Sequence, residues 1–136
     1  MTLQYSVTVR NAKLDAVETA IGTAPVLKIR TGAQPANCAA ADTGTVLVTI
    51  NLASDWMAAA SSGAKSMSGL PVTDLSADAT GTAGHFRLYA SNGTTCGLQG
   101  SITATGGGGD MTLDNVLIAT AQLVSITGFT LTDGNP

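Results

Sequence analysis

The chain of 136 residues is long enough for one domain, and folding at this length buries roughly two thirds of the surface of the unfolded chain. Only 11% of its residues are charged, about half the usual share in soluble domains, and the net charge is −3. The six Lys and Arg residues are scattered, so no basic patch is present to neutralise phosphates, and we expect no direct binding of DNA or RNA. No apolar run approaches the roughly 20 residues needed to cross a bilayer, and no secretory pattern opens the chain, so we expect it to be made and kept in the cytosol.

The first predicted element is an amphipathic helix at residues 3–21. Its apolar side chains fall on one stripe, formed by Leu3, Val7, Leu14, Val17 and Ile21. Gly22 ends the helix, whereas the β-branched residues 7–9 weaken its first turns. The helix therefore begins near Val9 or follows an extended arm. Its stripe packs either on a neighbouring subunit or on the β core of its own chain.

Alternating apolar residues predict strands at residues 26–31 and 46–52, separated by a long loop of small and turn-forming residues. Asp55 is placed to cap a short helical turn at residues 56–60, in which Trp56 covers the core. Around Pro71 we expect one or two short strands at a sheet edge or bulge, because proline cannot donate a ladder hydrogen bond.

A β-hairpin with its turn at Asn92-Gly93 is the clearest pattern in the chain. Before the turn Phe86, Leu88 and Ala90 alternate with His85, Arg87 and Tyr89, and after it Cys96, Leu98 and Ile102 share one parity. This period of two predicts strands with one buried and one solvated face.

The C-terminal third reads as a turn followed by short strands. The glycine run at residues 106–109 forms the turn, and residues 111–113 and 116–118 are apolar enough for strands. In the last strand, which starts at Val124, the apolar parity slips near Gly128, as it does at a β-bulge.

The pattern as a whole predicts a mainly β fold, an antiparallel β-sandwich or jelly-roll-like domain of seven to nine strands with one N-terminal α-helix. We divide the chain into an N-terminal arm and helix at residues 1–22 and a single β-sandwich domain at residues 23–136.

Searching for catalytic, metal and cofactor sites yields none. The glycine run lacks the Lys-Ser/Thr pair of a phosphate loop, and the aspartates do not have calcium-loop spacing. Asp110 with Asp114 holds a loop or an ion. His85, the only histidine, has no Gly-x-Ser-x-Gly partner, so we expect a surface residue and a chain that is not an enzyme.

Cys38 and Cys96 are too few for a disulfide framework and lack metal-ligand spacing. We expect both to stay reduced as small buried side chains. Cys96 shares the parity of Leu98 and Ile102 and is therefore predicted to be a buried thiol, whereas Cys38 lies in a loop.

Three segments, RNAKLD at residues 10–15, GHFR at 84–87 and GDMTLDN at 109–115, carry a resemblance that extends in order over nearly the whole chain. The chain resembles small structural proteins of tailed bacteriophages. That resemblance implies a virion protein, either a head decoration (cement) protein or a neck or tail component, with the major capsid protein or other virion proteins as partners. The low charge and the resemblance together predict a homo-oligomer, a trimer or dimer.

A carbohydrate-binding β-sandwich is the alternative from another class. Such modules stack sugars on exposed aromatic rings. Only five aromatic residues are available here, namely Tyr5, Trp56, Phe86, Tyr89 and Phe129.

Overall fold

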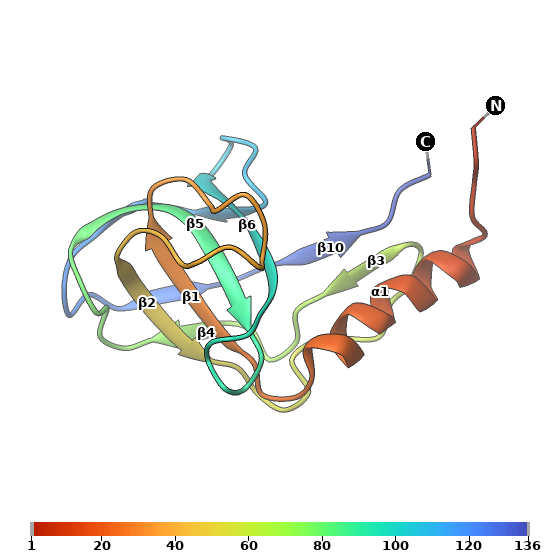
Figure 1. The fold of residues 1–136 in the computed structure, drawn as a ribbon, viewed down its shortest axis with the longest axis horizontal. Coiled ribbons are helices and arrows are strands. Elements are labelled where there is room, and N and C mark those ends of the chain that lie inside the picture. Colours follow the sequence, from red (N-terminus) through yellow and green to blue (C-terminus); the bar gives the residue numbers. More distant parts are fainter. Residues whose placement is uncertain (1, 136) are drawn as a thin grey trace.

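The computed structural model describes residues 2–135, which form one helix and ten strands (Figure 1). The elements are α1 (Val7–Ile21), β1 (Val26–Thr31), β2 (Val46–Asn51), β3 (Ala64–Ser66), β4 (Val72–Asp74), β5 (Gly81–Tyr89), β6 (Cys96–Ala104), β7 (Met111–Leu113), β8 (Leu117–Ile118), β9 (Val124–Ile126) and β10 (Thr130–Thr132). The predicted mainly β fold with one N-terminal helix is confirmed.

The main sheet has the strand order β2-β1-β5-β6-β7, with β8 paired to the start of β5. Two smaller sheets pair β10 with β3 and β4 with β9. All pairs are antiparallel except β6–β7, which is parallel because the glycine turn at residues 105–110 brings the chain back along β6. The sheet is therefore mixed at this one edge.

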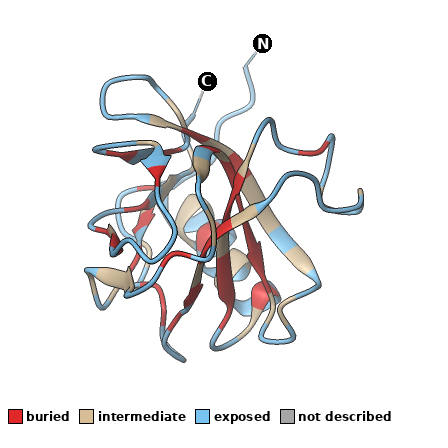
Figure 2. Cartoon of the chain, turned by 90° about the vertical axis from the view of Figure 1, so that its left-hand side faces the viewer, coloured by how far each residue is buried: buried red, intermediate tan, exposed pale blue. Residues whose placement is uncertain are grey.

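One face of the main sheet forms the hydrophobic core. Cross-strand rows stack Leu27 beside Leu88, and Ile29 beside Phe86. The Phe86 ring lies over Gly100, where a Cβ atom would come within 2.7 Å of it, and meets Phe129 edge-on at 5.5 Å between centroids. Figure 2 shows that the buried residues are concentrated in these central strands.

Trp56 closes the core as expected, with 1% of its surface exposed and its indole N–H donating to the Gly22 carbonyl at 3.0 Å. The helical turn predicted at residues 56–60 is wrong. This segment runs extended, since the Ala58 amide donates to Ser66 and Met57 forms a bridge with Met67. Pairing with the next segment satisfies the backbone groups that a helical turn would have paired internally.

The helix begins at Val7, not at residue 3, with Ser6 as its N-cap, and residues 2–6 form an extended arm. It ends at Gly22, whose φ of 92° suits glycine. Leu14 and Ile21 are buried against the chain's own core, whereas Leu3 is 70% and Val7 50% exposed. The stripe is thus divided: its C-terminal half is covered and its N-terminal half is open. Within residues 2–135, no helix is long and apolar enough to cross a membrane.

The parity slip near Gly128 marks a change of sheet rather than a β-bulge in one strand. β9 pairs with β4, whereas β10 pairs with β3, and Phe129 between them is buried beside Phe86. A chain that passes from one sheet to another does not keep one alternation of apolar residues, because each sheet sets its own buried face.

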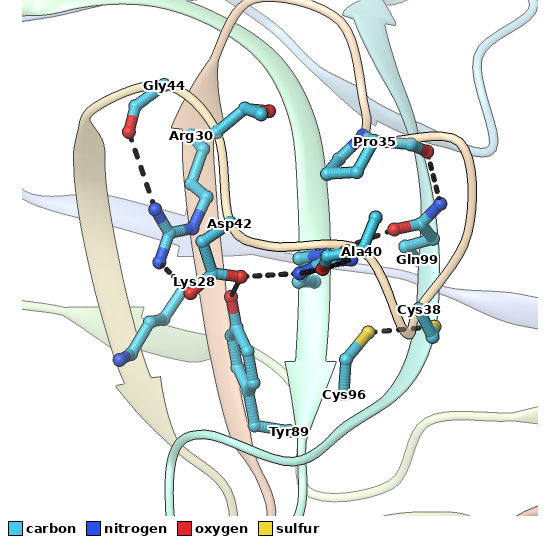
Figure 3. A network of polar contacts seen from close by, with 12 residues as sticks. Lys28, Arg30, Pro35, Cys38, Ala40, Asp42, Gly44, Tyr89, Cys96 and Gln99 are labelled. Carbon is cyan, nitrogen blue, oxygen red and sulfur yellow. Dashed lines mark hydrogen bonds and ion pairs between the residues drawn. The ribbon is translucent and has the colours of Figure 1, made fainter.

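The second face of the main sheet is not solvated. His85, Arg87 and Tyr89 are at most 2% exposed, so the predicted wet face of this strand is wrong. The loop at residues 32–44, called the long loop below, covers these side chains, and Figure 3 shows its Asp42 against Tyr89.

The divided stripe predicts unequal costs for two helix substitutions. Leu14→Ala should lower the free energy of unfolding by about 2–4 kcal/mol, because it leaves a cavity in a packed site. Val9→Ala, at a residue that is 43% exposed, should change it by less than about 0.5 kcal/mol. Urea denaturation of the two variants tests this, and equal costs would contradict the assigned packing.

Candidate functional site

The long loop is closed at its base by the strands that it joins. The Thr31 amide donates to the Thr45 carbonyl at 3.1 Å, and the Thr45 amide donates to Thr31 Oγ1 at 2.9 Å. Gly44 has φ 70°, and a Cβ atom there would collide with the Thr31 carbonyl. The loop therefore leaves and rejoins the sheet at fixed points and folds back over its second face.

Arg87 of β5 holds the loop through its guanidinium. This group donates to the Asn37 carbonyl at 2.8 Å and to the Ala40 carbonyl at 3.1 and 3.2 Å. It also donates to Asp42 Oδ1 at 2.5 Å and, through Nε, to Gln99 Oε1 at 3.0 Å. The rigid fork of five N–H donors suits this role, because one side chain reaches three points of the loop.

Asp42 is the counter-charge in this network. Its Oδ1 also accepts from the Tyr89 hydroxyl at 2.7 Å, and its Oδ2 accepts from Arg30 at 2.8 Å. The Asp42 side chain is 40% exposed, whereas those of Arg30 and Arg87 are 8% and 2% exposed. We call Arg30, Asp42, Arg87, Tyr89 and Gln99 the polar clamp.

The clamp shifts the ionisation of its members. Burial raises the pKa of Asp42, but hydrogen bonds from Tyr89 and Arg87 and the positive charge of both arginines outweigh it, so its pKa lies below the ordinary value. Burial, followed by the hydrogen bond to Asp42, raises the pKa of Tyr89. At neutral pH the clamp is therefore an aspartate between two guanidinium groups and a neutral phenol.

Two further contacts extend the clamp along the loop and the hairpin. Gln99 Nε2 donates to the Pro35 carbonyl at 2.7 Å. Lys28 lies with Nζ 5.1 Å from the centroid of the Tyr89 ring and donates to the Gly93 carbonyl at 3.2 Å. The loop and the hairpin turn are thus held by the same face of the sheet.

His85 is fully buried, which corrects the prediction of a surface residue. Its Nδ1 lies 2.8 Å from the Gly32 carbonyl, and because a carbonyl only accepts, Nδ1 carries the proton. Gly84 allows this approach, since a Cβ atom there would collide with Gly32. The histidine therefore fastens the first residue of the long loop.

The two cysteines meet at the edge of the clamp. Cys38 of the loop and Cys96 of β6 are free thiols with their Sγ atoms 2.8 Å apart, and both are half-buried. Cys96 does not share the face of Leu98, because the pairing of β5 with β6 slips between Leu88 and Tyr89. This bulge turns Cys96 toward the loop, so the predicted core thiol is wrong.

The acidic pair singled out in the sequence holds loops. Asp110 Oδ2 accepts from the amide and the hydroxyl of Ser101, both at 2.8 Å, and these hydrogen bonds lower its pKa. Asp114 Oδ1 lies 3.5 Å from the Thr105 hydroxyl. Among residues 2–135, no group of three or more His, Cys, Asp or Glu side chains gathers where it could bind a metal ion.

A second candidate site lies at the N-terminal end, where four large apolar side chains are exposed on the arm and the first turns of α1. Leu3 is 70%, Val7 50%, Val9 43% and Tyr5 41% exposed, and we call these four residues the apolar arm. The two chain ends lie on the same side of the molecule (Figure 1), and Tyr5 pairs with Asn135 through two hydrogen bonds of 2.9 Å. The arm is therefore held in place while much of its apolar surface stays exposed, although Lys13 Nζ lies 4.5 Å from the centroid of the Tyr5 ring.

The segment RNAKLD joins the helix beneath this arm to β3 and β10. Arg10 donates to the Asp133 carbonyl, Asn11 accepts from the Gly63 amide at 2.9 Å, and Lys13 pairs with Asp133 at 2.8 Å. Asp15 pairs at 2.7 Å with Lys65, whose side chain is 2% exposed. The polar residues of this segment fix the direction of the helix.

The polar clamp was not predicted from the sequence, because the alternating pattern places the charged residues of a strand on its solvated face. One signal was available. Lys28 and Arg30 in one strand, and His85 and Arg87 in another, share the parity opposite to the apolar residues, and a long loop with a single aspartate, Asp42, follows the first strand. Two basic rows beside one acidic loop indicate a covered polar face.

Comparisons with protein-family models, with curated proteins and with solved structures found no match to this chain.

The clamp predicts the effect of removing its acidic member. Asp42→Asn should lower the free energy of unfolding at neutral pH by about 1–3 kcal/mol, because the buried Arg87 guanidinium loses its counter-charge but keeps its carbonyl partners. Asp55→Asn, at an exposed aspartate outside the clamp, is the control and should change it by less than about 0.5 kcal/mol. Equal effects in denaturant melts would show that the clamp does not hold the fold.

The lowered pKa of Asp42 predicts that the effect of the same variant on stability depends on pH. Because the pKa of Asp42 is lower in the folded chain than in the unfolded one, its contribution is present above the unfolded value of about 3.9 and is lost as the pH falls through the folded value. The difference in melting temperature between the native chain and Asp42→Asn should therefore shrink as the pH falls from about 6 to about 3. A difference that widens over this range would contradict the assigned sign.

Proposed function

We propose that this chain is a non-enzymatic structural protein of a tailed-bacteriophage particle, a head decoration or cement protein. In this proposal it is made in the bacterial cytoplasm, forms a trimer or dimer, and binds the major capsid protein or other virion proteins in the virion. The observation that carries the proposal is the apolar arm, Leu3, Tyr5, Val7 and Val9, exposed at the end of the molecule where both chain ends lie.

The apolar arm has the physical character of a contact surface. Grouped exposed apolar side chains mark interaction sites more often than single ones do. Full burial of a large apolar side chain contributes roughly 1.5–3 kcal/mol, so covering Leu3 and Val7 alone gives a useful share of a subunit contact. The Tyr5–Asn135 pair holds the arm extended beforehand, which reduces the ordering cost on binding.

The resemblance to phage structural proteins and the low charge of 11% support the same proposal. The segment RNAKLD, on which the resemblance partly depends, fixes the helix that carries the apolar arm. A neck or tail component would use such an arm in the same way, and it remains the alternative location.

The burial of the aromatic side chains argues against the carbohydrate-binding alternative. Trp56, Phe86, Tyr89 and Phe129 are at most 7% exposed, which leaves Tyr5 as the exposed aromatic side chain among residues 2–135. The hollow of about 400 Å³ beside β8 is lined by Thr80, Gly81, Thr82, Leu117, Ile118, Ala119 and Gln122, with no aromatic ring for a sugar to stack on.

Replacing the apolar arm tests the proposal. A variant with Leu3→Ser, Val7→Ser and Val9→Ser should lose self-association and binding to empty phage heads by at least about tenfold, because its contact surface becomes polar. The matched control carries Leu75→Ser, Leu117→Ser and Leu123→Ser, which are 57–77% exposed at other places, and should bind like the native chain. Sedimentation of each protein, alone and with heads, measures both properties.

Thermal melts of the two variants serve as the control for folding, and we expect equal melting temperatures. Native protein that stays a strict monomer and never sediments with heads would reject the decoration role. Sedimentation with isolated tails in place of heads would favour the neck or tail alternative.

A further inference from the structure

We propose that Cys38 and Cys96 form a reversible disulfide when the folded chain meets a small disulfide such as oxidised glutathione, so that a covalent bond joins the long loop to β6. The proposal is independent of the phage role. It assigns a redox modification to two residues that the sequence pattern predicts to be separate, reduced side chains.

The fold places the two thiols together from segments 58 positions apart in the chain, with their Sγ atoms 2.8 Å apart. Both backbones are held independently of the thiols. The Asn37 and Ala40 carbonyls on either side of Cys38 accept from Arg87, and Cys96 is paired with Tyr89 at the start of β6. Figure 3 shows the two thiols facing each other. The polar clamp therefore holds Cys38 against Cys96 before any bond forms.

The bulge in β6 gives Cys96 its direction. Gly97 is exposed but faces Ile21 at the end of α1, where a Cβ atom would come within 2.6 Å of that side chain, and Leu98 packs on the core. Because Leu98 pairs with Leu88 and Cys96 pairs with Tyr89, the extra residue Gly97 places Cys96 on the face of Tyr89, toward the loop. Both thiols are half-buried, so a small reagent reaches them without unfolding of the chain.

The reaction proceeds by two exchanges. The Cys38 thiolate attacks one sulfur of oxidised glutathione, forms a mixed disulfide and releases one glutathione thiolate. The Cys96 thiolate then attacks Cys38 Sγ and releases the second glutathione thiolate. Two protein thiols are oxidised by two electrons in total, one small disulfide is reduced to two thiols, and the two protons pass through solvent to the released thiolates.

The environment of Cys96 fits this order of events. Burial, followed by the hydrogen bond to Cys38 and the interaction with its charge, raises the pKa of Cys96 to about 12, whereas the charge of Arg87 lowers it. The first attack therefore falls to Cys38. Once Cys38 is in a mixed disulfide, its hydrogen bond and charge no longer raise the pKa of Cys96; burial still raises it, and the charge of Arg87 still lowers it.

The proposal is compatible with reduced thiols in a reducing cytosol. On oxidation the bond would cross-link residues 58 positions apart and restrict the unfolded chain. The oxidised chain should melt on the order of 10 °C above the reduced one.

Redox titration of the full chain tests the proposal. The native protein is equilibrated with mixtures of oxidised and reduced glutathione. Its free thiols are then blocked with a maleimide, and its mass is measured by mass spectrometry. We expect both alkylation sites to disappear together, leaving a chain two hydrogens lighter with a peptide linked through Cys38 and Cys96. In urea, half-oxidation should need at least about a tenfold more oxidising mixture, because the fold no longer holds the thiols together.

Cys38→Ser and Cys96→Ser are the controls: Cys96→Ser, which keeps Cys38, should give a glutathione adduct, Cys38→Ser, which keeps Cys96, should react more slowly, and neither should show the rise in melting temperature. A native chain that keeps two alkylatable thiols in oxidised glutathione, or that ends with adducts on both cysteines, would overturn the proposal. A bridge that forms as readily in urea as in the native chain would overturn it as well.

Discussion

Burial of the Arg87 guanidinium beneath the long loop is the constraint on which the rest of the structure depends. A charge that is 2% exposed is costly unless it is paired and hydrogen-bonded, and here one carboxylate, two backbone carbonyls and one amide meet that need. Three of these four partners belong to residues 37–42. The sheet is therefore complete only when the loop lies over it, and the loop is ordered only because the sheet presents Arg87.

The same logic recurs where the chain joins distant segments. The segment RNAKLD ties α1 to β3 and β10, GHFR supplies Arg87 and the His85 contact to Gly32, and GDMTLDN supplies the Asp110 carboxylate that accepts from Ser101. Each of these three segments thus supplies contacts between elements. Because few residues are charged, the polar contacts between segments join particular pairs of side chains. The apolar arm is the part of the helix end that these contacts leave exposed.

Local pattern was sufficient for the elements that obey a single period. Alternation placed β1, β2, β5 and β6, and Gly22 placed the end of α1, because these features depend on nearest neighbours in the sequence. Alternation does not say what covers each face, so burial of His85 and Arg87 was missed. It also fails at bulges and sheet changes, which reversed the face of Cys96 and divided the last strand at Gly128. The polar clamp includes contacts over 12 positions, such as Arg87 with Gln99, but its centre joins Asp42 to Arg87 and Tyr89 over 45 or more positions, and such contacts have no local pattern.

Hydrogen exchange in an Arg87→Lys variant measures most directly whether the buried guanidinium orders the loop. Lysine keeps the charge but lacks the planar fork that reaches Asn37, Ala40 and Asp42 together. The account predicts that amides of residues 36–44 exchange at least about tenfold faster than in the native chain, while amides of β3 and α1 are unchanged. Unchanged protection of residues 36–44 in a variant that is otherwise folded would contradict it.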